Sequence, residues 1–217
     1  MRQIVGLKCV FIIVILLMGT LCGVVVHAAE FKGMAGFGYD FGGETLVSAT
    51  NSEGRTAKLN ANEGQVWYGG LLMVTDEFET QATIGYKSGR LDATTGSLSI
   101  SATPIYLNGK NGYVAFTAIP VELLEFYRVG NIRLGLGFSY IINPTVVIDT
   151  TPNTSGTNGT YKFDNTVATL AQIGWVPDSG YFSIDLRITS VKYKQNSPAT
   201  SRDFSGGSAG VYFNVFF

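Results

Sequence analysis

The chain has 217 residues, of which 46% are apolar and only 14% are charged, and this composition excludes a disordered segment, a collagen or a coiled coil. Lysine and arginine number 15 against 16 acidic residues, for a formal net charge of −1. The chain therefore lacks the basic excess of a nucleic-acid-binding protein, and no nucleic-acid partner is expected.

The first 28 residues are predicted to be a signal peptide for export, which leaves one domain over residues 29–217. Arg2 and Lys8 supply a basic start, a long apolar run follows, and the small residues around Ala28 fit a cleavage site. The apolar stretch over residues 10–26 also approaches the length of a membrane-spanning helix, so an uncleaved anchor is the alternative.

All the cysteine and histidine in the chain lies in this leader, at Cys9, Cys22 and His27. The predicted mature chain therefore contains neither residue type. This excludes nucleophiles activated by histidine, His or Cys metal sites, thiol redox chemistry and disulfides. The sequence predicts a protein that is not an enzyme and has no cofactor and no metal centre.

Period-two alternation recurs along the rest of the chain, and no window has the apolar spacing of a confident helix. The predicted fold class is therefore all-β. Eight strands are expected, over residues 31–41, 65–74, 79–87, 118–123, 132–140, 167–175, 182–189 and 209–217.

The two faces of these strands differ in composition, and the difference predicts the architecture. In the first strand Phe31, Phe37 and Phe41 share one face, whereas Gly36 and Asp40 lie on the other. A face of glycine, serine and opposite charges suits the narrow interior of a small barrel, while a face of aromatic and aliphatic side chains suits lipid. Closing the sheet also satisfies every backbone donor and acceptor in hydrocarbon. We predict a closed antiparallel up-and-down transmembrane β-barrel of eight strands.

The connections between these strands alternate in length, as expected for short periplasmic turns and long outer loops. Short links lie near residues 76, 129 and 178, and long links start near residues 42, 89, 142 and 194. In the first long link, residues 46–50 and 55–59 are predicted to extend as strands around a turn at 51–54. Residues 97–107 are also strand-like; we place them in the second outer loop, and a ninth membrane strand is the alternative.

These features together resemble the small eight-stranded bacterial outer-membrane β-barrels, the group that includes the transmembrane domain of outer membrane protein A and the outer membrane protein X type. The resemblance covers residues 31–217 and rests on the leader, on the segments 119–122 and 135–140, and on the last strand. In that family the chain ends on an aromatic residue preceded by alternating apolar residues, a signal for the β-barrel assembly machinery. Val211, Phe213, Val215 and Phe217 match this signal, although Val215 stands where an aromatic residue is usual.

The resemblance implies a location in the bacterial outer membrane. It also implies contact with outer-membrane lipid and lipopolysaccharide, and a monomeric state.

Nine charged residues have inward parity in this scheme, and we interpret them as an interior network of opposite charges that pair away from bulk water. They are Lys32, Asp40, Glu79, Lys87, Glu122, Arg133, Asp164, Asp185 and Arg187. A gate or polar conduit is the alternative role, although a barrel of eight strands is narrow. Glu125 has outward parity near a turn, where it lies at the membrane interface or is turned inward by a bulge.

The first functional hypothesis is an integral outer-membrane barrel whose extracellular loops carry a structural or surface-interaction role. The polar, uncharged segment 150–160 is an example of such a loop. The second hypothesis is a narrow channel or transporter for small or apolar solutes, and the third is a soluble secreted β-protein. The acids Glu122 and Asp185 do not by themselves indicate general acid–base catalysis, because any two carboxylates in a barrel would give the same pattern.

Overall fold

The computed structural model describes residues 29–50, 56–93, 96–100, 103–107, 111–151, 158–195 and 203–217. The predicted signal peptide lies outside the described residues, as does most of the polar loop 150–160. No helix within these ranges is long and apolar enough to cross a membrane.

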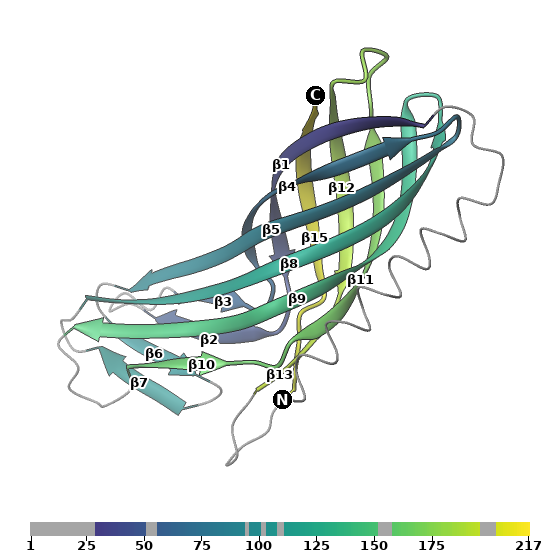
Figure 1. Cartoon of the computed structure of the whole chain (residues 1–217). Coiled ribbons are helices and arrows are strands. Elements are labelled where there is room, and N and C mark those ends of the chain that lie inside the picture. The colour runs from purple at the N-terminus through teal and green to yellow at the C-terminus, as the bar shows by residue number, and fades with distance from the viewer. Residues whose placement is uncertain are drawn as a thin grey trace.

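Eight strands form a closed antiparallel ring in which each strand pairs with its neighbours along the chain (Figure 1). The ring consists of β1 (Glu30–Gly42), β4 (Gly64–Val74), β5 (Phe78–Ala93), β8 (Asn111–Val129), β9 (Ile132–Thr151), β11 (Thr166–Trp175), β12 (Phe182–Ser190) and β15 (Ser208–Phe216). The first and last strands pair from Met34↔Phe216 to Gly42↔Ser208, which closes the barrel. The predicted fold class and strand count are confirmed.

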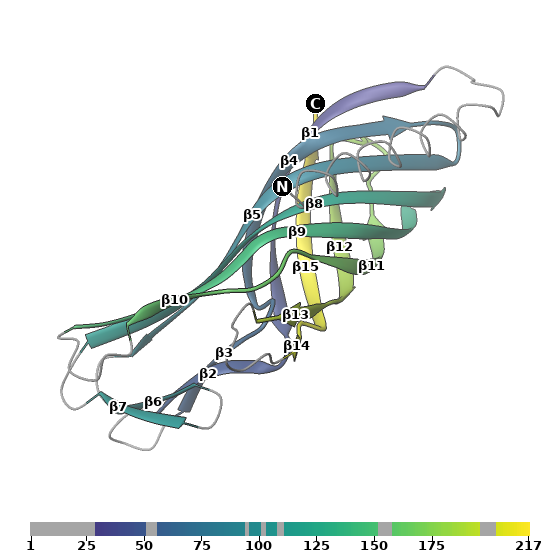
Figure 2. The same cartoon turned by 60° about the horizontal axis from the view of Figure 1, so that its bottom comes forward.

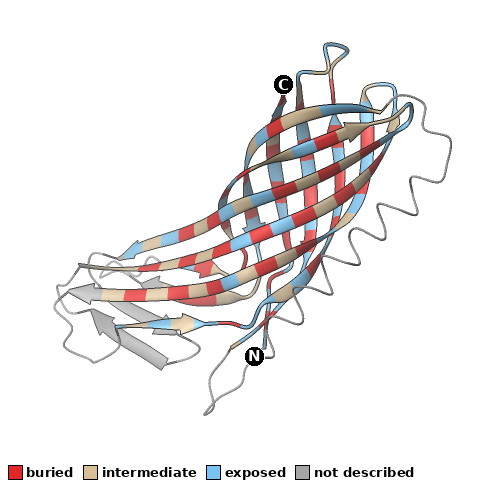
Figure 3. Ribbon diagram, viewed as in Figure 1, coloured by how far each residue is buried: buried red, intermediate tan, exposed pale blue. Residues whose placement is uncertain are grey.

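Burial alternates along the ring strands, as the banding in Figure 3 shows. Inward positions hold small and polar residues together with some large apolar ones such as Phe126. Outward positions hold large apolar residues such as Trp67 and Leu136, which are 57% and 71% exposed. In β4 both faces are apolar, and the structure turns Val66, Tyr68 and Leu72 inward. A closed sheet with an apolar exterior and a polar interior is the arrangement that hydrocarbon demands. The chain is a membrane-spanning β-barrel.

Aromatic side chains gather where the strands meet the short turns. Phe78 and Tyr127 lie at the ends of β5 and β8 with their ring centroids 5.4 Å apart. Trp175 and Phe182 pair across the link between β11 and β12 at 5.8 Å. Such amphipathic rings favour the boundary between hydrocarbon and water, so they mark one edge of the membrane-spanning belt.

The connections confirm the predicted alternation of short and long links. The links at residues 75–77, 130–131 and 176–181 are short, and Gly130 has a φ of 58° in the tightest of them. Because that conformation is costly for residues with a Cβ, glycine suits this turn. The remaining links all leave the opposite end of the barrel (Figures 1 and 2).

At that opposite end the chain builds a second body, which we call the outer lobe. β5, β8 and β9 run on beyond the barrel, and β10 (Gly159–Lys162) pairs with the distal part of β9. With 19 residues, β8 is about 60 Å long, whereas a membrane crossing takes about 9–11 residues. The lobe also contains β2 (Thr45–Thr50), β3 (Thr56–Asn60), β6 (Gly96–Ile100), β7 (Thr103–Leu107), β13 (Lys192–Lys194) and β14 (Asp203–Ser205).

These elements decide two of the open predictions. β2 and β3 form the expected hairpin in the first long link. The strand-like segment near residues 97–107 forms the β6–β7 hairpin, which joins β2 and β3 in a four-stranded sheet separate from the ring. The alternative of a ninth membrane strand is therefore wrong.

The outer lobe has a hydrophobic core of its own, which sequence patterning did not reveal. An aromatic group stands at its base, with Tyr193 packed edge-on against Phe116 and Phe163 at 5.6 and 6.1 Å, and with Phe204 beyond. The whole core comprises Leu46, Val47, Leu59, Ala61, Val114, Phe116, Ala118, Ile141, Val146, Ile148, Phe163, Ala168, Val191, Tyr193 and Phe204. A core of this extent holds the outer lobe as a packed structure rather than as separate loops.

The outward belt can be tested by placing a charge in it. Leu136→Arg is expected to lower the free energy of unfolding in phospholipid vesicles by about 2–4 kcal/mol, because arginine on the lipid face is most costly near mid-membrane. Ser190→Arg, on an exposed position at the outer end of β12, is the control and should cost about 0–1 kcal/mol. Denaturant titration of both variants checks this, and equal losses would show that Leu136 does not face hydrocarbon.

Candidate functional site

The structure brings seven of the nine predicted charged residues together inside the barrel. They are Asp40, Glu79, Lys87, Glu122, Arg133, Asp185 and Arg187, all buried. Each lies on an inward position of a ring strand. Because the ring is closed, these residues lie close together in space although they are far apart in sequence. They divide into two groups, one around Arg133 and one around Arg187 and Lys87.

Arg133 on β9 is the centre of the first group and is completely buried. Its guanidinium donates to both carboxylate oxygens of Asp185 at 2.9 Å and to Glu79 Oε2 at 3.1 Å. It also lies over the Phe126 ring at 4.3 Å. Asn214 donates to Asp185 and accepts from the Tyr68 hydroxyl at 2.6 Å. Hydrogen bonds thus surround a charge that would be very costly if it were buried alone.

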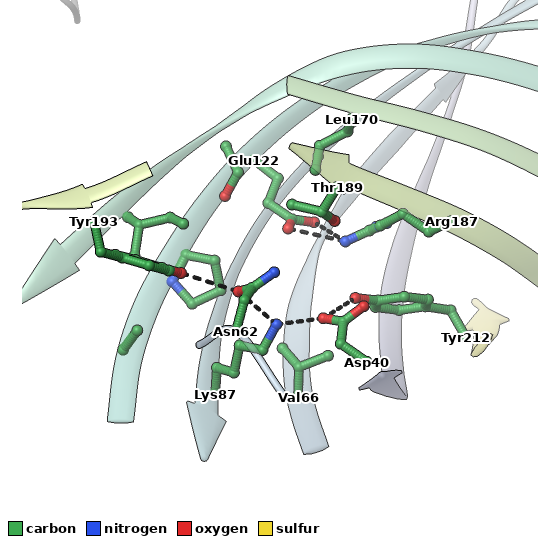
Figure 4. Close-up of a pocket in the computed structure, with 14 residues that line it drawn as sticks. Asp40, Asn62, Val66, Lys87, Glu122, Leu170, Arg187, Thr189, Tyr193 and Tyr212 are labelled. Atoms are coloured by element: carbon green, nitrogen blue, oxygen red, sulfur yellow. Dashed lines mark hydrogen bonds and ion pairs between the residues drawn. The ribbon is translucent and has the colours of Figure 1, made fainter. Parts of the chain in front are cut away.

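Arg187 on β12 organises the second group, part of which Figure 4 shows. Its Nη1 donates to both oxygens of Glu122 at 2.9 and 3.0 Å, and its Nε donates to Gln172 at 2.7 Å. The guanidinium stands 4.0 Å from the ring centre of Tyr212, in cation–π geometry. The Tyr212 hydroxyl in turn donates to Asp40 at 2.8 Å, which links this arginine to the next ion pair.

Asn62 connects the interior charges to the outer lobe. Lys87 forms a short ion pair with Asp40 and also donates to Asn62 Oδ1 at 2.8 Å. The same oxygen accepts from the Tyr193 hydroxyl of the lobe core at 3.0 Å, as Figure 4 shows. Asn62 holds a φ of 70°, a conformation that asparagine tolerates better than most residues. One buried amide therefore joins the barrel interior to the base of the lobe.

The interior is filled rather than open. A cavity of about 20 Å³ lies among Asp40, Lys87, Glu122 and Arg187, which is room for about one water molecule. In the described interior each of the four buried carboxylates is ion-paired with a base. Geometry of this kind neutralises charge and fixes the strands, and it leaves no carboxylate unpaired for proton transfer.

Two of the nine residues lie elsewhere. Lys32 is inward in register but stands at the short-turn rim, where its amine is 3.5 Å from exposed Glu30. Asp164 is exposed, and the prediction that it faces the interior is wrong. It precedes β11, which begins at Thr166, so the alternation of that strand does not extend to it.

Glu125 keeps its outward parity. Its carboxylate accepts from the Thr80 hydroxyl at 2.7 Å on the neighbouring strand, and pairing of β8 with β5 and β9 is regular at this position. Of the two predicted positions for Glu125, the structure fits the membrane interface, because no bulge turns the side chain into the barrel.

The structure also adds residues that the sequence interpretation missed. Arg128 reaches Glu79 at 3.3 Å; continuing the alternation of residues 118–123 to the end of β8 would have found it. Tyr68, Tyr212 and Asn214 sit on inward positions but are neither small nor charged, so the rule used for the interior passed over them. Asn62 lies between β3 and β4, where no periodicity exists to indicate its role.

The four residues of the predicted assembly signal share the outward side of the last strand. Val211 and Val215 are exposed at 46% and 42%, Phe217 is the most exposed at 77%, and Phe213 packs on Phe37 at 5.8 Å. Their role in assembly stays a prediction.

No protein-family model matches the chain, and no curated protein matches it. Solved structures do match. Ail, the attachment invasion locus protein of Yersinia pestis, is 10% identical with a TM-score of 0.49 over 88% of this chain and 100% of its own. Neisserial surface protein A is 12% identical with a TM-score of 0.47 over 88% and 100%, and outer membrane protein AlkL is 12% identical with a TM-score of 0.43 over 89% and 93%.

The fold assignment itself rests on the closed ring of strand pairs in this chain.

The buried arginine provides the second test. Arg133→Gln is expected to lower the free energy of unfolding in detergent micelles by about 3–5 kcal/mol, because it leaves Asp185 buried without its ion-pair partner and Glu79 paired with Arg128 alone. Lys32→Gln removes a partly exposed pair and should cost about 0–1 kcal/mol. Unfolding titrations with guanidinium chloride measure the free energy of unfolding of both variants. A loss for Arg133→Gln no larger than that for Lys32→Gln would contradict the network.

Proposed function

We propose that this chain is an integral protein of the bacterial outer membrane that acts in surface interaction through its outer lobe. The observation that carries the proposal is the large hydrophobic core of that lobe, which is separate from the two smaller apolar clusters in the barrel and is built on strands that continue directly from the barrel. Rigid scaffolds of this kind present loops for recognition. A chain with only a membrane-anchoring role would need neither the long strands nor the second core.

The filled interior supports the same proposal. Ion pairs occupy the barrel, and the aromatic group at Tyr193, Phe116 and Phe163 packs at the base of the lobe. A barrel of eight strands has room for little beyond its own side chains. The alternative, a narrow channel or transporter for small or apolar solutes, is supported only by the charged lining of the small cavity.

Export and assembly complete the proposal. Residues 1–28 serve as the signal peptide, and the β-barrel assembly machinery reads Phe217 and the alternating apolar residues before it. The belt then contacts outer-membrane lipid and lipopolysaccharide, and the barrel acts as a monomer. We assign no reaction and no cofactor to the interior.

Conductance separates the proposal from the channel alternative. In planar bilayers the wild-type chain is expected to give no steady current, and Glu122→Gln is expected to give none either, because Arg187 and Gln172 still fill the barrel at that level. A steady wild-type current that changes in Glu122→Gln would favour the conduit and contradict a closed interior.

Trimming the lobe tests surface interaction directly. β5 and β8 stay paired as far as Ala93↔Gly112, so replacing residues 94–111 by an Asn-Gly turn closes the hairpin and removes β6 and β7. Bacteria that display the trimmed chain should adhere less to immobilised glycans, matrix proteins or other bacterial cells than bacteria that display the wild type. Unchanged heat-modifiable migration shows that the barrel is intact, and equal adherence of both strains would contradict a role for this part of the lobe.

A further inference from the structure

The ladder between β5 and β8 has a break in its hydrogen-bonded pairing. Pairing runs to Ile84↔Val121 and resumes in the same register at Lys87↔Ala118. Two rows between these pairs, Gly85 with Pro120 and Tyr86 with Ile119, are not bridged. Pro120 has no N–H to donate, and a proline inside a sheet removes a ladder bond.

A shallow, open groove lies on the lipid side of this break. Trp67, Gly69, Ile84, Gly85, Tyr86 and Ile119 line it. Tyr68 also lines the groove, although its side chain points into the barrel. On the inner side, Pro120 and Ala118 line the small interior cavity.

The sequence of β4 explains the depression. Trp67 and Leu71 are outward and strongly exposed, and Gly69 between them has no side chain. A Cβ at Gly69 would meet only the Met34 carbonyl oxygen at 3.6 Å, an ordinary contact. The groove therefore lies where Gly69 leaves space between large outward side chains, and close backbone packing does not require a glycine there.

We propose that this groove binds one acyl chain of a membrane phospholipid. None of the residues that line it is charged, and Trp67, Ile84 and Tyr86 are 57%, 60% and 51% exposed on the face that the belt presents to hydrocarbon. The groove is continuous with the lipid-facing surface, so an acyl chain reaches it without crossing a polar region.

Filling the groove tests the proposal. Gly69→Leu places an aliphatic side chain in the space without a backbone clash. Ala171→Leu adds the same side chain to an exposed position of β11, four strands away around the ring in either direction, and is the matched control. Both variants and the wild type are folded into vesicles of dimyristoyl phosphatidylcholine, extracted in mild detergent and examined by native mass spectrometry.

The wild type and Ala171→Leu are expected to retain one phospholipid per barrel. Gly69→Leu should retain it about tenfold less, because several methylene contacts are lost. Three results would overturn the proposal: a wild type without bound lipid, equal retention in Gly69→Leu, or a protein dimer that Gly69→Leu abolishes, which would make the groove a contact between copies. Heat-modifiable migration of Gly69→Leu confirms that any loss of lipid is not a loss of fold.

Discussion

Satisfaction of backbone hydrogen bonds in hydrocarbon is the constraint on which the rest of this structure depends. A strand in lipid has no water to bond with, so the sheet has to close on itself. Pairing of β1 with β15 achieves the closure. Once the ring has eight strands its interior is narrow, so it is filled by side chains, and the charged side chains among them are paired with opposite charges. The exterior, in contrast, is free to be uniformly apolar.

The interior charges follow from that narrowness. Arg133 and Arg187 are each clamped by carboxylates, hydrogen-bonded and stacked near an aromatic ring. Arginine suits such sites because its planar fork makes paired hydrogen bonds to a carboxylate. Since every pair joins residues of different strands, the network also specifies which strands come together. Buried ion pairs contribute little net stability compared with apolar packing, so we attribute to them a role in fixing the arrangement of the ring.

Alternation alone was sufficient to predict the ring, because a barrel repeats the same physical demand in every strand. Ile132, Leu134 and Leu136 could face lipid only if Arg133 faced inward. The pattern was insufficient in β4, where apolar residues occur on both faces and only the register with β1 shows that Tyr68 is inside. The strands predicted from the pattern also stopped near the membrane boundary, so the distal parts of β8 and β9 were missed. Asn62 and the lobe core depend on contacts between loops far apart in sequence, which no local periodicity records.

The unbroken passage of β8 and β9 from the membrane into the lobe has a mechanical consequence. The two strands pair from Asn111↔Thr151 to Val129↔Ile132 with one irregularity near Thr117, so no flexible linker separates the lobe from its anchor. A pull on the lobe acts along these strands and loads many ladder hydrogen bonds in shear at the same time, instead of opening them one after another. The lobe is thus held firmly on the barrel and can bear tension that acts along these strands.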